Sequence, residues 1–309
     1  MDRSKKIIPP LNVPPEQFPE TDELPEGART VAWADTIGGP VDLIPGIQYA
    51  VREGCPLHIE LYRPALAEPA PLIVHVQGSA WMKQRMFQSV SLLIRLAEKG
   101  YAIASVEYRP SEVSPFPAQV EDVKTAMVFL AKRAAEYGLD MDRVAVWGDS
   151  SGGHTAALVG VTGARELFPA GEDAAAFPQI RAIVDWYGPT EIAEMNRYPS
   201  GMDHIAPTSP EGLLIGGKNV LENPELAERT TVMNYLSADV ETPPMLIMHG
   251  GSDMLVPFNQ SCRLYERLRA LRKEASMIKL VGGRHGFAGF RSENALAAVD
   301  AFIREHLPG

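Results

Sequence analysis

The chain has 309 residues, of which 45% are apolar and 22% charged, and its formal net charge is -10. This length suits one large α/β domain, and the composition is far from the charge-rich, apolar-poor pattern of disordered chains. The acidic balance opposes binding to nucleic-acid phosphates, which needs clustered Lys and Arg. We therefore expect a globular protein without a nucleic-acid partner.

The cysteines and the N-terminal segment bear on the cellular compartment. Cys55 and Cys262 lie far apart without metal-ligand spacing, which predicts reduced thiols and no disulfide framework or zinc site. The first residues are basic, but prolines interrupt them before the apolar stretch of a secretory signal. No run of about eighteen uncharged apolar residues occurs, so no membrane span is expected. The sequence predicts a cytoplasmic location and leaves the oligomeric state open, a homo-oligomer included.

Residues 1–45 form a predicted N-terminal arm. Proline restricts this stretch to extended backbone. We expect either a strap or tail without its own core, or a segment that covers the substrate or bridges a dimer. Residues 46–309 are predicted to form the single folded domain, which contains the motifs described below. The arm's prolines include Pro9, Pro10, Pro14, Pro15, Pro19 and Pro25.

A mostly parallel sheet follows the arm. Residues 46–64 contain two apolar-alternating runs around Arg52-Glu53-Gly54, which predicts an antiparallel hairpin. Six compact β-type runs come next, mostly separated by helix-period segments, and this alternation is typical of parallel strands. The two strands of the hairpin and these six runs make eight predicted strands. The six runs are 72–76, 102–107, 144–147, 182–186, 245–249 and 276–280.

Five segments with apolar residues three and four positions apart are predicted helices that cover both faces of the sheet. Between the strands ending at Trp186 and beginning at Met245, roughly sixty residues intervene, too many for an ordinary crossover. We expect an apolar cap or lid over residues 191–240. The predicted helices span 89–99, 118–137, 152–162, 259–271 and 293–306.

The sharpest motif is Gly148-Asp149-Ser150-Ser151-Gly152, which stands between an apolar strand and a helix-compatible stretch. This arrangement is typical of a nucleophile elbow, a turn so tight that only small residues fit two positions before and after the serine. We therefore expect Ser150 to be a catalytic nucleophile.

A serine nucleophile needs a histidine base, which a carboxylate holds in one tautomer. Asp253 and His285 each stand in a loop after a predicted strand, at the edge where parallel sheets bind ligands. They are the expected acid and base, although Asp253 could instead only shape its turn. Among the other histidines, His204 is the alternative candidate, either as a wall of the substrate pocket or as a solvated residue.

Backbone N–H groups should stabilise the oxyanion that forms during acyl transfer. Ser151, directly after the nucleophile, is one expected donor. The loop Gln77-Gly78-Ser79-Ala80-Trp81 follows the strand 72–76 and should supply the others.

These motifs together resemble the α/β-hydrolase superfamily, and within it the branches similar to hormone-sensitive lipase and to acetyl xylan or feruloyl esterases. The resemblance covers residue 46 to the C-terminus. It includes Glu107-Tyr108-Arg109-Pro110, the Pro-Phe-Pro-Ala run 115–118 and Asp122. The resemblance implies an α/β-hydrolase fold. We expect Arg109 and Asp122 to be a buried structural pair, because that stretch of the family lies away from the nucleophile.

One departure concerns the oxyanion loop, where such relatives carry His-Gly-Gly-Gly-Trp. Alignment on Trp81 implies Ser79 and Ala80 as main-chain donors, with Gly78 as the turn residue and a further candidate. Gln77 replaces the histidine that braces the loop in the family, so another brace is needed.

The predicted function is hydrolysis of carboxylic esters through an acyl-enzyme, without cofactor or metal. By resemblance, the substrate is a short-chain ester or an acetyl or hydroxycinnamoyl ester of a carbohydrate. An arylformamidase or a serine peptidase of the same fold is an alternative, and so is a non-catalytic binding module. Trp81, Trp186 and Tyr187 could form a stacking wall for the substrate or belong to the core.

Overall fold

The protein was analysed as a computed structural model, which describes residues 40–163, 165, 167–171 and 173–308 and the short stretches 12–14, 17, 19–20 and 25–26. Residues 38–309 form one compact unit. Most of the predicted arm therefore lies outside the described residues. The first strand begins at Val41, before the domain boundary predicted at residue 46.

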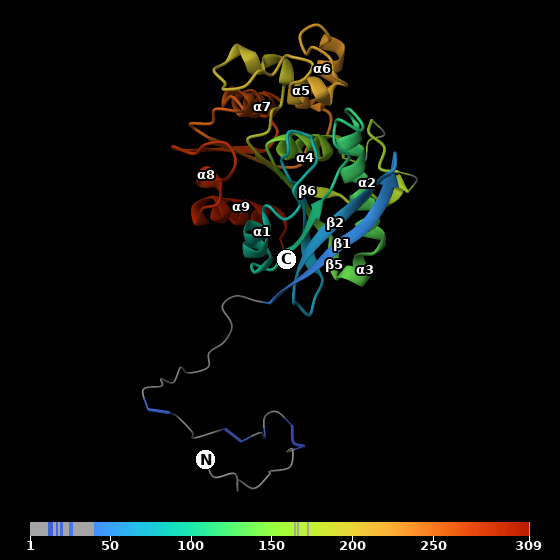
Figure 1. The fold of residues 1–309 in the computed structure, drawn as a ribbon, viewed down its shortest axis with the longest axis vertical. Helices are drawn as coiled ribbons and strands as arrows, with labels where there is room; N and C mark the ends of the chain where they lie inside the picture. The colour runs from blue at the N-terminus through green and yellow to red at the C-terminus, as the bar shows by residue number, and fades with distance from the viewer. Residues whose placement is uncertain are drawn as a thin grey trace, which may run out of the picture. The chain divides into compact units, whose positions relative to one another are not determined.

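The described chain contains the predicted eight-stranded sheet (Figure 1). The strands lie in the order β1-β2-β4-β3-β5-β6-β7-β8. The hairpin β1–β2 and the β2–β4 pair are antiparallel, and the remaining pairs are parallel. The strands are β1 Val41–Arg52, β2 Cys55–Pro64, β3 Ala70–Val76, β4 Ala102–Val106, β5 Leu139–Asp149, β6 Ile180–Trp186, β7 Met245–Gly250 and β8 Ala275–Leu280.

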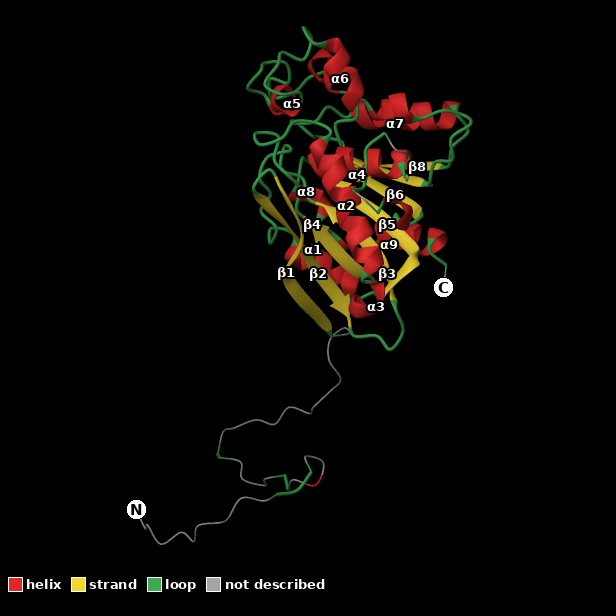
Figure 2. Cartoon of the chain, turned by 90° about the vertical axis from the view of Figure 1, so that its right-hand side faces the viewer, coloured by secondary structure: helices red, strands yellow, loops and turns green. Residues whose placement is uncertain are grey.

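Helices pack on both faces of the sheet, as the sequence predicts (Figures 1 and 2). On β3, Leu72 and Val74 join the apolar cluster with α2, α4 and α7, whereas Ile73 joins the cluster with α1 and α9. This alternation follows from the two-residue period of a strand. The helices are α1 Val90–Ala97, α2 Ala118–Lys132, α3 Ala134–Tyr137, α4 Ser151–Thr162, α5 Pro210–Leu214, α6 Pro224–Thr230, α7 Asn259–Ala270, α8 Phe287–Phe290 and α9 Glu293–His306. Among the described residues, none of these helices combines the length and the apolar character needed to cross a bilayer.

The connection between β6 and β7 contains α5, α6 and two short 3-10 helices, Ile192–Arg197 and Val232–Tyr235. Figures 1 and 2 both place α5 and α6 at one end of the domain, beyond α7. Leu214 and Val220 of this connection form a small apolar cluster with Trp81. The connection is therefore attached to the domain next to the loop that follows β3.

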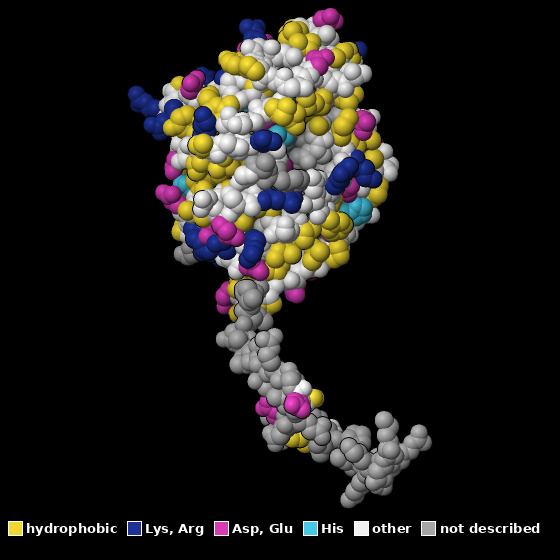
Figure 3. Space-filling model, turned by 60° about the vertical axis from the view of Figure 1, so that its left-hand side comes forward, with side chains coloured by type: hydrophobic (Ala, Val, Ile, Leu, Met, Phe, Trp, Pro, Cys, Tyr) yellow, Lys and Arg dark blue, Asp and Glu magenta, His cyan; other side chains and the backbone are white. Residues whose placement is uncertain are grey.

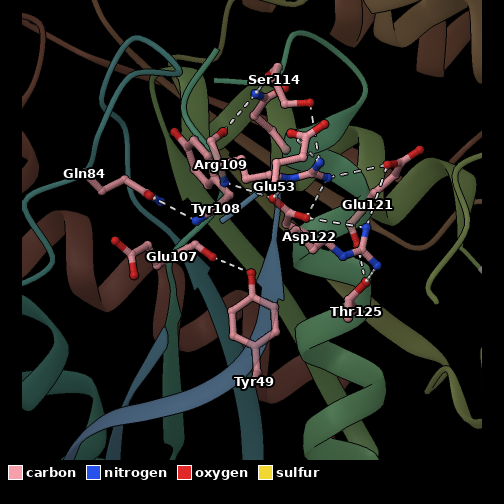
Figure 4. A network of polar contacts seen from close by, with 12 residues as sticks. Tyr49, Glu53, Gln84, Glu107, Tyr108, Arg109, Ser114, Glu121, Asp122 and Thr125 are labelled. Carbon is pink, nitrogen blue, oxygen red and sulfur yellow. Dashed lines mark hydrogen bonds and ion pairs between the residues drawn. The ribbon is translucent and has the colours of Figure 1, made fainter. Parts of the chain in front are cut away.

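The predicted buried pair of Arg109 and Asp122 is confirmed (Figure 4). The guanidinium Nε and Nη2 donate to the two carboxylate oxygens of Asp122, each over 2.9 Å. Arg109 Nη1 also donates to Glu53, in the turn between β1 and β2, over 3.1 Å. The pair thus ties the hairpin and the segment after β4 to α2.

Replacing Asp122 by alanine should lower the free energy of unfolding by about 3–5 kcal/mol, because the buried guanidinium then loses its main counter-charge. Urea denaturation measures this loss. Asp142→Ala is the control, since the Asp142 side chain is exposed and such substitutions usually change stability by less than about 0.5 kcal/mol. A loss below about 1 kcal/mol for Asp122→Ala would contradict the structural role of the pair.

Candidate active site

Ser150 lies in the tight turn between β5 and α4, with φ 53° and ψ -128°. A positive φ is uncommon for a residue with a Cβ atom and marks a strained turn. A Cβ atom on Gly148 would overlap the carbonyl of Gly152, and one on Gly152 would overlap the carbonyl of Val76. The two glycines therefore let the first turn of α4 approach the sheet closely enough to form the turn.

Ser150, His285 and Asp253 come together at the carboxyl edge of the sheet. Ser150 Oγ lies 2.9 Å from His285 Nε2. On the other side of the ring, His285 Nδ1 lies 2.7 Å from Asp253 Oδ2. The arrangement is that of a hydroxyl, an imidazole and a carboxylate in a hydrogen-bonded relay.

The side chain of Asp253 is buried, and its carboxylate has several donors. Its Oδ1 accepts hydrogen bonds from the N–H groups of Leu255 at 2.8 Å and Val256 at 3.0 Å. Burial alone raises the pKa of Asp253, but hydrogen bonds from His249 and His285 outweigh it and hold the pKa well below its ordinary value. The carboxylate is therefore ionised at neutral pH.

His249 is a neighbour of the site that sequence reasoning placed only at a strand end. Its Nε2 lies 3.0 Å from the carbonyl of Val256 and 3.4 Å from Asp253 Oδ2, and its Nδ1 lies 2.7 Å from Ser261 Oγ. Because a carbonyl only accepts, Nε2 is assigned the proton. The one available signal is position: His249 is the last residue of the predicted strand 245–249 and the last but one of β7, just before the loop of Asp253.

The four expected oxyanion donors differ in whether their N–H groups already make a hydrogen bond. Gly78 N–H donates to Asp149 Oδ1 over 3.1 Å, and Ser79 N–H donates to Ser151 Oγ over 2.9 Å. Ala80 N–H makes no hydrogen bond within the described part of the chain. Ser151 opens α4, so its N–H has no partner inside the helix. Neighbouring side chains therefore already accept the N–H groups of Gly78 and Ser79, and the oxyanion role of all four residues stays a prediction.

Tyr108 braces this loop and was missed by the sequence analysis, which placed its stretch away from the nucleophile. The Tyr108 hydroxyl lies 3.0 Å from Ser79 Oγ and donates to the Gln77 carbonyl over 3.2 Å. Burial raises the pKa of Tyr108 to about 12, so the hydroxyl keeps its proton. Its backbone N–H donates to Gln84, as Figure 4 shows. Tyr108 supplies the support that the family's histidine would give.

A cavity of about 250 Å³ opens beside Ser150. Its walls come from the oxyanion loop, the elbow, the loop after Asp253, and the connection between β6 and β7. Trp81 and His204 line it, as the sequence suggests. On the face that Figure 3 shows, acidic, basic and apolar side chains are interspersed. Further lining residues include Gln77, Gln88, Met202, Pro210, Glu211, Leu255 and Val256.

Trp186 and Tyr187 do not line this cavity, so their proposed place in the substrate pocket is corrected. Trp186 is buried between Trp147 and Phe290, with ring centroids 4.8 Å and 5.0 Å away. Tyr187 is equally buried, and its ring centroid lies 4.8 Å from that of His285. Both aromatic rings belong to the core, and the ring of Tyr187 packs against the imidazole of His285.

Comparison with known proteins shows that the chain is similar to esterases. The family model described as BD-FAE matches residues 59–268. Esterase LipC of Mycobacterium tuberculosis is 27% identical over 248 residues, which are 77% of this chain and 59% of LipC. The chain spans 57–59% of the length of LipC, LipM and LipQ, three curated relatives from that organism.

Solved structures agree with this fold. A truncated carbohydrate esterase from gut microbiota superposes with a TM-score of 0.77 at 27% identity, covering 89% of this chain and 99% of that one. A bifunctional GH43-CE protein of Bacteroides eggerthii is 31% identical with a TM-score of 0.74, covering 86% of this chain and 38% of that one. The fold is the α/β-hydrolase fold that the sequence resemblance implies.

Asp185 lies near the end of β6, beneath the elbow. Its ionisation makes the stability of the folded protein depend on pH. Its side chain is fully buried, Oδ1 accepts the N–H of Gly188 over 2.9 Å, and Oδ2 has no partner among the described residues. Burial raises the pKa of Asp185 to about 7, against about 3.9 in an unfolded chain. Because the folded pKa is the higher one, its stabilising contribution is complete below about pH 4 and is lost as the pH rises through 7.

Asp185→Asn should therefore become more stable relative to the wild type as the pH rises from 5 to 8, because the amide keeps the bond to Gly188 without ionising. The melting temperature of both proteins across this range measures the effect. Asp142→Asn, at an exposed position on β5, should show no such trend. A difference between Asp185→Asn and wild type that stays constant with pH would contradict the raised pKa.

Proposed function

The chain belongs to the BD-FAE family, and we propose that it is a serine hydrolase that cleaves carboxylic esters through an acyl-enzyme at Ser150. The observation that carries the proposal is the relay in which Ser150 Oγ is 2.9 Å from His285 Nε2 and His285 Nδ1 is 2.7 Å from Asp253. The esterase names of its relatives support it.

In the first step, Ser150 Oγ attacks the ester carbonyl while His285 Nε2 takes the hydroxyl proton. The tetrahedral intermediate collapses, the bond to the alcohol oxygen breaks, and His285 gives the proton to the leaving alcohol. Water then attacks the acyl-enzyme with His285 again as base, and the acid leaves. The ionised Asp253 stabilises the imidazolium that forms in each step. Chemistry of this kind needs no metal or organic cofactor.

We assign the oxyanion to the N–H groups of Ala80 and Ser151, which have no hydrogen-bond partner among the described residues. Ser79 N–H can join them only after Ser151 Oγ rotates away from it, since that bond is 2.9 Å long. Gly78 then acts as a structural residue, because its N–H is held by Asp149. Donors fixed in advance by the fold stabilise the transition-state charge without further reorganisation.

The substrate class proposed is a short-chain ester or an acetyl or hydroxycinnamoyl ester of a carbohydrate. The cavity of about 250 Å³ supports a small substrate, and the carbohydrate esterase named above is a structural neighbour. Residues 191–240 act as a cap in this proposal, since Met202, His204 and Glu211 line the cavity. Residues 46–309 form the catalytic domain.

An arylformamidase or a peptidase would use the same relay, so substrates distinguish these alternatives. A non-catalytic binding module would have no need for a hydrogen-bonded serine, histidine and aspartate. The cytoplasmic location, the homo-oligomer and the role of the arm in residues 1–45 stay predictions.

Ser150→Ala should lower kcat for p-nitrophenyl acetate by at least about a thousandfold, leaving the catalysis that binding and the oxyanion donors provide. The wild type should prefer acetate to dodecanoate in a panel of p-nitrophenyl esters that also includes acetylated xylooligosaccharides, methyl ferulate and N-formylkynurenine. The exposed Ser252→Ala, in the loop after β7, is the control. A Ser150→Ala variant that keeps more than a tenth of the activity would refute the assignment of the nucleophile, and faster turnover of N-formylkynurenine than of every ester would favour the formamidase.

A further inference from the structure

Two buried polar atoms on residues that line the cavity have no hydrogen-bond partner within the described chain. They are Oε2 of Glu211 and Oε1 of Gln77. Both residues are nearly inaccessible, at 3% relative exposure each. A buried polar atom without a partner costs about 1–3 kcal/mol, and more when it is charged. Such groups require an explanation, and because these two residues line the cavity, a ligand bound there can supply the missing hydrogen bonds.

Glu211 is fixed in place by its other oxygen. Glu211 Oε1 lies 3.0 Å from His204 Nδ1, and His204 Nε2 lies 2.8 Å from Ser200 Oγ. The Ser200 hydroxyl in turn lies 3.0 Å from the carbonyl of Leu255, near the relay carboxylate. This chain of contacts attaches the connection between β6 and β7 to the loop of Asp253, and it leaves Glu211 Oε2 as the unused acceptor.

Gln77 is the first residue of the oxyanion loop, directly after β3. Among the described residues, its side-chain amide makes one hydrogen bond, which Nε2 donates to Gln88 Oε1 over 3.3 Å. The nitrogen and oxygen of an amide are assigned from its contacts, so a flipped pair would leave Nε2 of Gln77 unpaired in place of Oε1. In either orientation, one polar atom of Gln77 lacks a partner.

The ligand that fits both groups carries hydroxyls. A carboxylate only accepts a hydrogen bond, whereas the free amide atom accepts or donates, and a hydroxyl can satisfy both. Apolar side chains such as Trp81, Met202 and Leu255 also line the cavity. A sugar ring combines several hydroxyls with apolar C–H faces, whereas a feruloyl group has a single phenolic hydroxyl.

We propose that Glu211 and Gln77 form a hydroxyl-binding subsite that selects esters of polyhydroxylated alcohols, with the sugar ring held between the cap and the oxyanion loop. This inference rests on the proposed ester hydrolysis and names the residues that recognise the alcohol part of the ester. His204 is a positioning residue in this subsite, since it acts through Glu211.

The test compares two acetates with the same acyl group, a monoacetylated methyl xyloside and cyclohexyl acetate, whose ring has no hydroxyl. The readout is the ratio of their kcat/KM values. Glu211→Gln should lower this ratio about tenfold or more, since hydrogen bonds to charged groups contribute about 1.5–3 kcal/mol. Gln77→Met should lower the ratio as well, and it tests the subsite independently if Glu211→Gln does not fold.

Glu225→Gln, on the exposed surface of α6, is the matched control and should leave the ratio unchanged. The subsite is refuted if the ratio stays at the wild-type value in both Glu211→Gln and Gln77→Met, or if each variant slows the two esters equally. A wild-type protein that hydrolyses neither acetate would instead refute the proposed function. The two failures are therefore distinguishable.

Discussion

The close approach of α4 to the sheet is the constraint on which the site depends. Three glycines at the junction of β5 and α4 allow this approach. A Cβ atom on Gly148, Gly152 or Gly153 would overlap backbone atoms or the carboxylate of Asp185. This packing holds Ser150 at a positive φ and directs its hydroxyl to the carboxyl edge of the sheet. His285 and Asp253 are arranged relative to this hydroxyl oxygen.

The fold and the relay could be predicted from the sequence because they follow from local patterns. Alternating apolar runs and helix-period segments predicted all eight strands, and parallel strands bring their following loops to one edge. Asp253 and His285 follow the neighbouring strands β7 and β8, so their meeting at Ser150 needs no further information. The turn at Ser150 is equally local, since its motif contains the glycines that it requires.

The side-chain hydrogen bonds and packing contacts around the site could not be predicted, because they join segments that are distant in the sequence. The sequence predicts Ser79 as an oxyanion donor, but the hydroxyl of Ser151 accepts its N–H. Tyr108 reaches the oxyanion loop from the end of β4, and no spacing in the sequence relates the two. Trp186 was open to either a pocket or a core role, and only its packing against Trp147 and Phe290 assigns it to the core.

Two buried carboxylates illustrate the difference between a structural group and a binding group. Asp122 has hydrogen bonds to both oxygens from Arg109, and it lies away from the cavity. Glu211 has one oxygen bound to His204 and one without a partner, and it lines the cavity. Because a buried polar atom without a hydrogen-bond partner is costly, the second arrangement suits a site where a ligand completes the bonding.

The central claim is that the fold activates the hydroxyl of Ser150. Reaction of the folded protein with a fluorophosphonate, followed by peptide mapping by mass spectrometry, tests it most directly. The account predicts a covalent adduct on Ser150 that is lost in His285→Ala, because the hydroxyl then has no base to take its proton. Folded wild-type protein that stays unlabelled, or that carries the adduct on Ser151 or Ser200 instead, would contradict it.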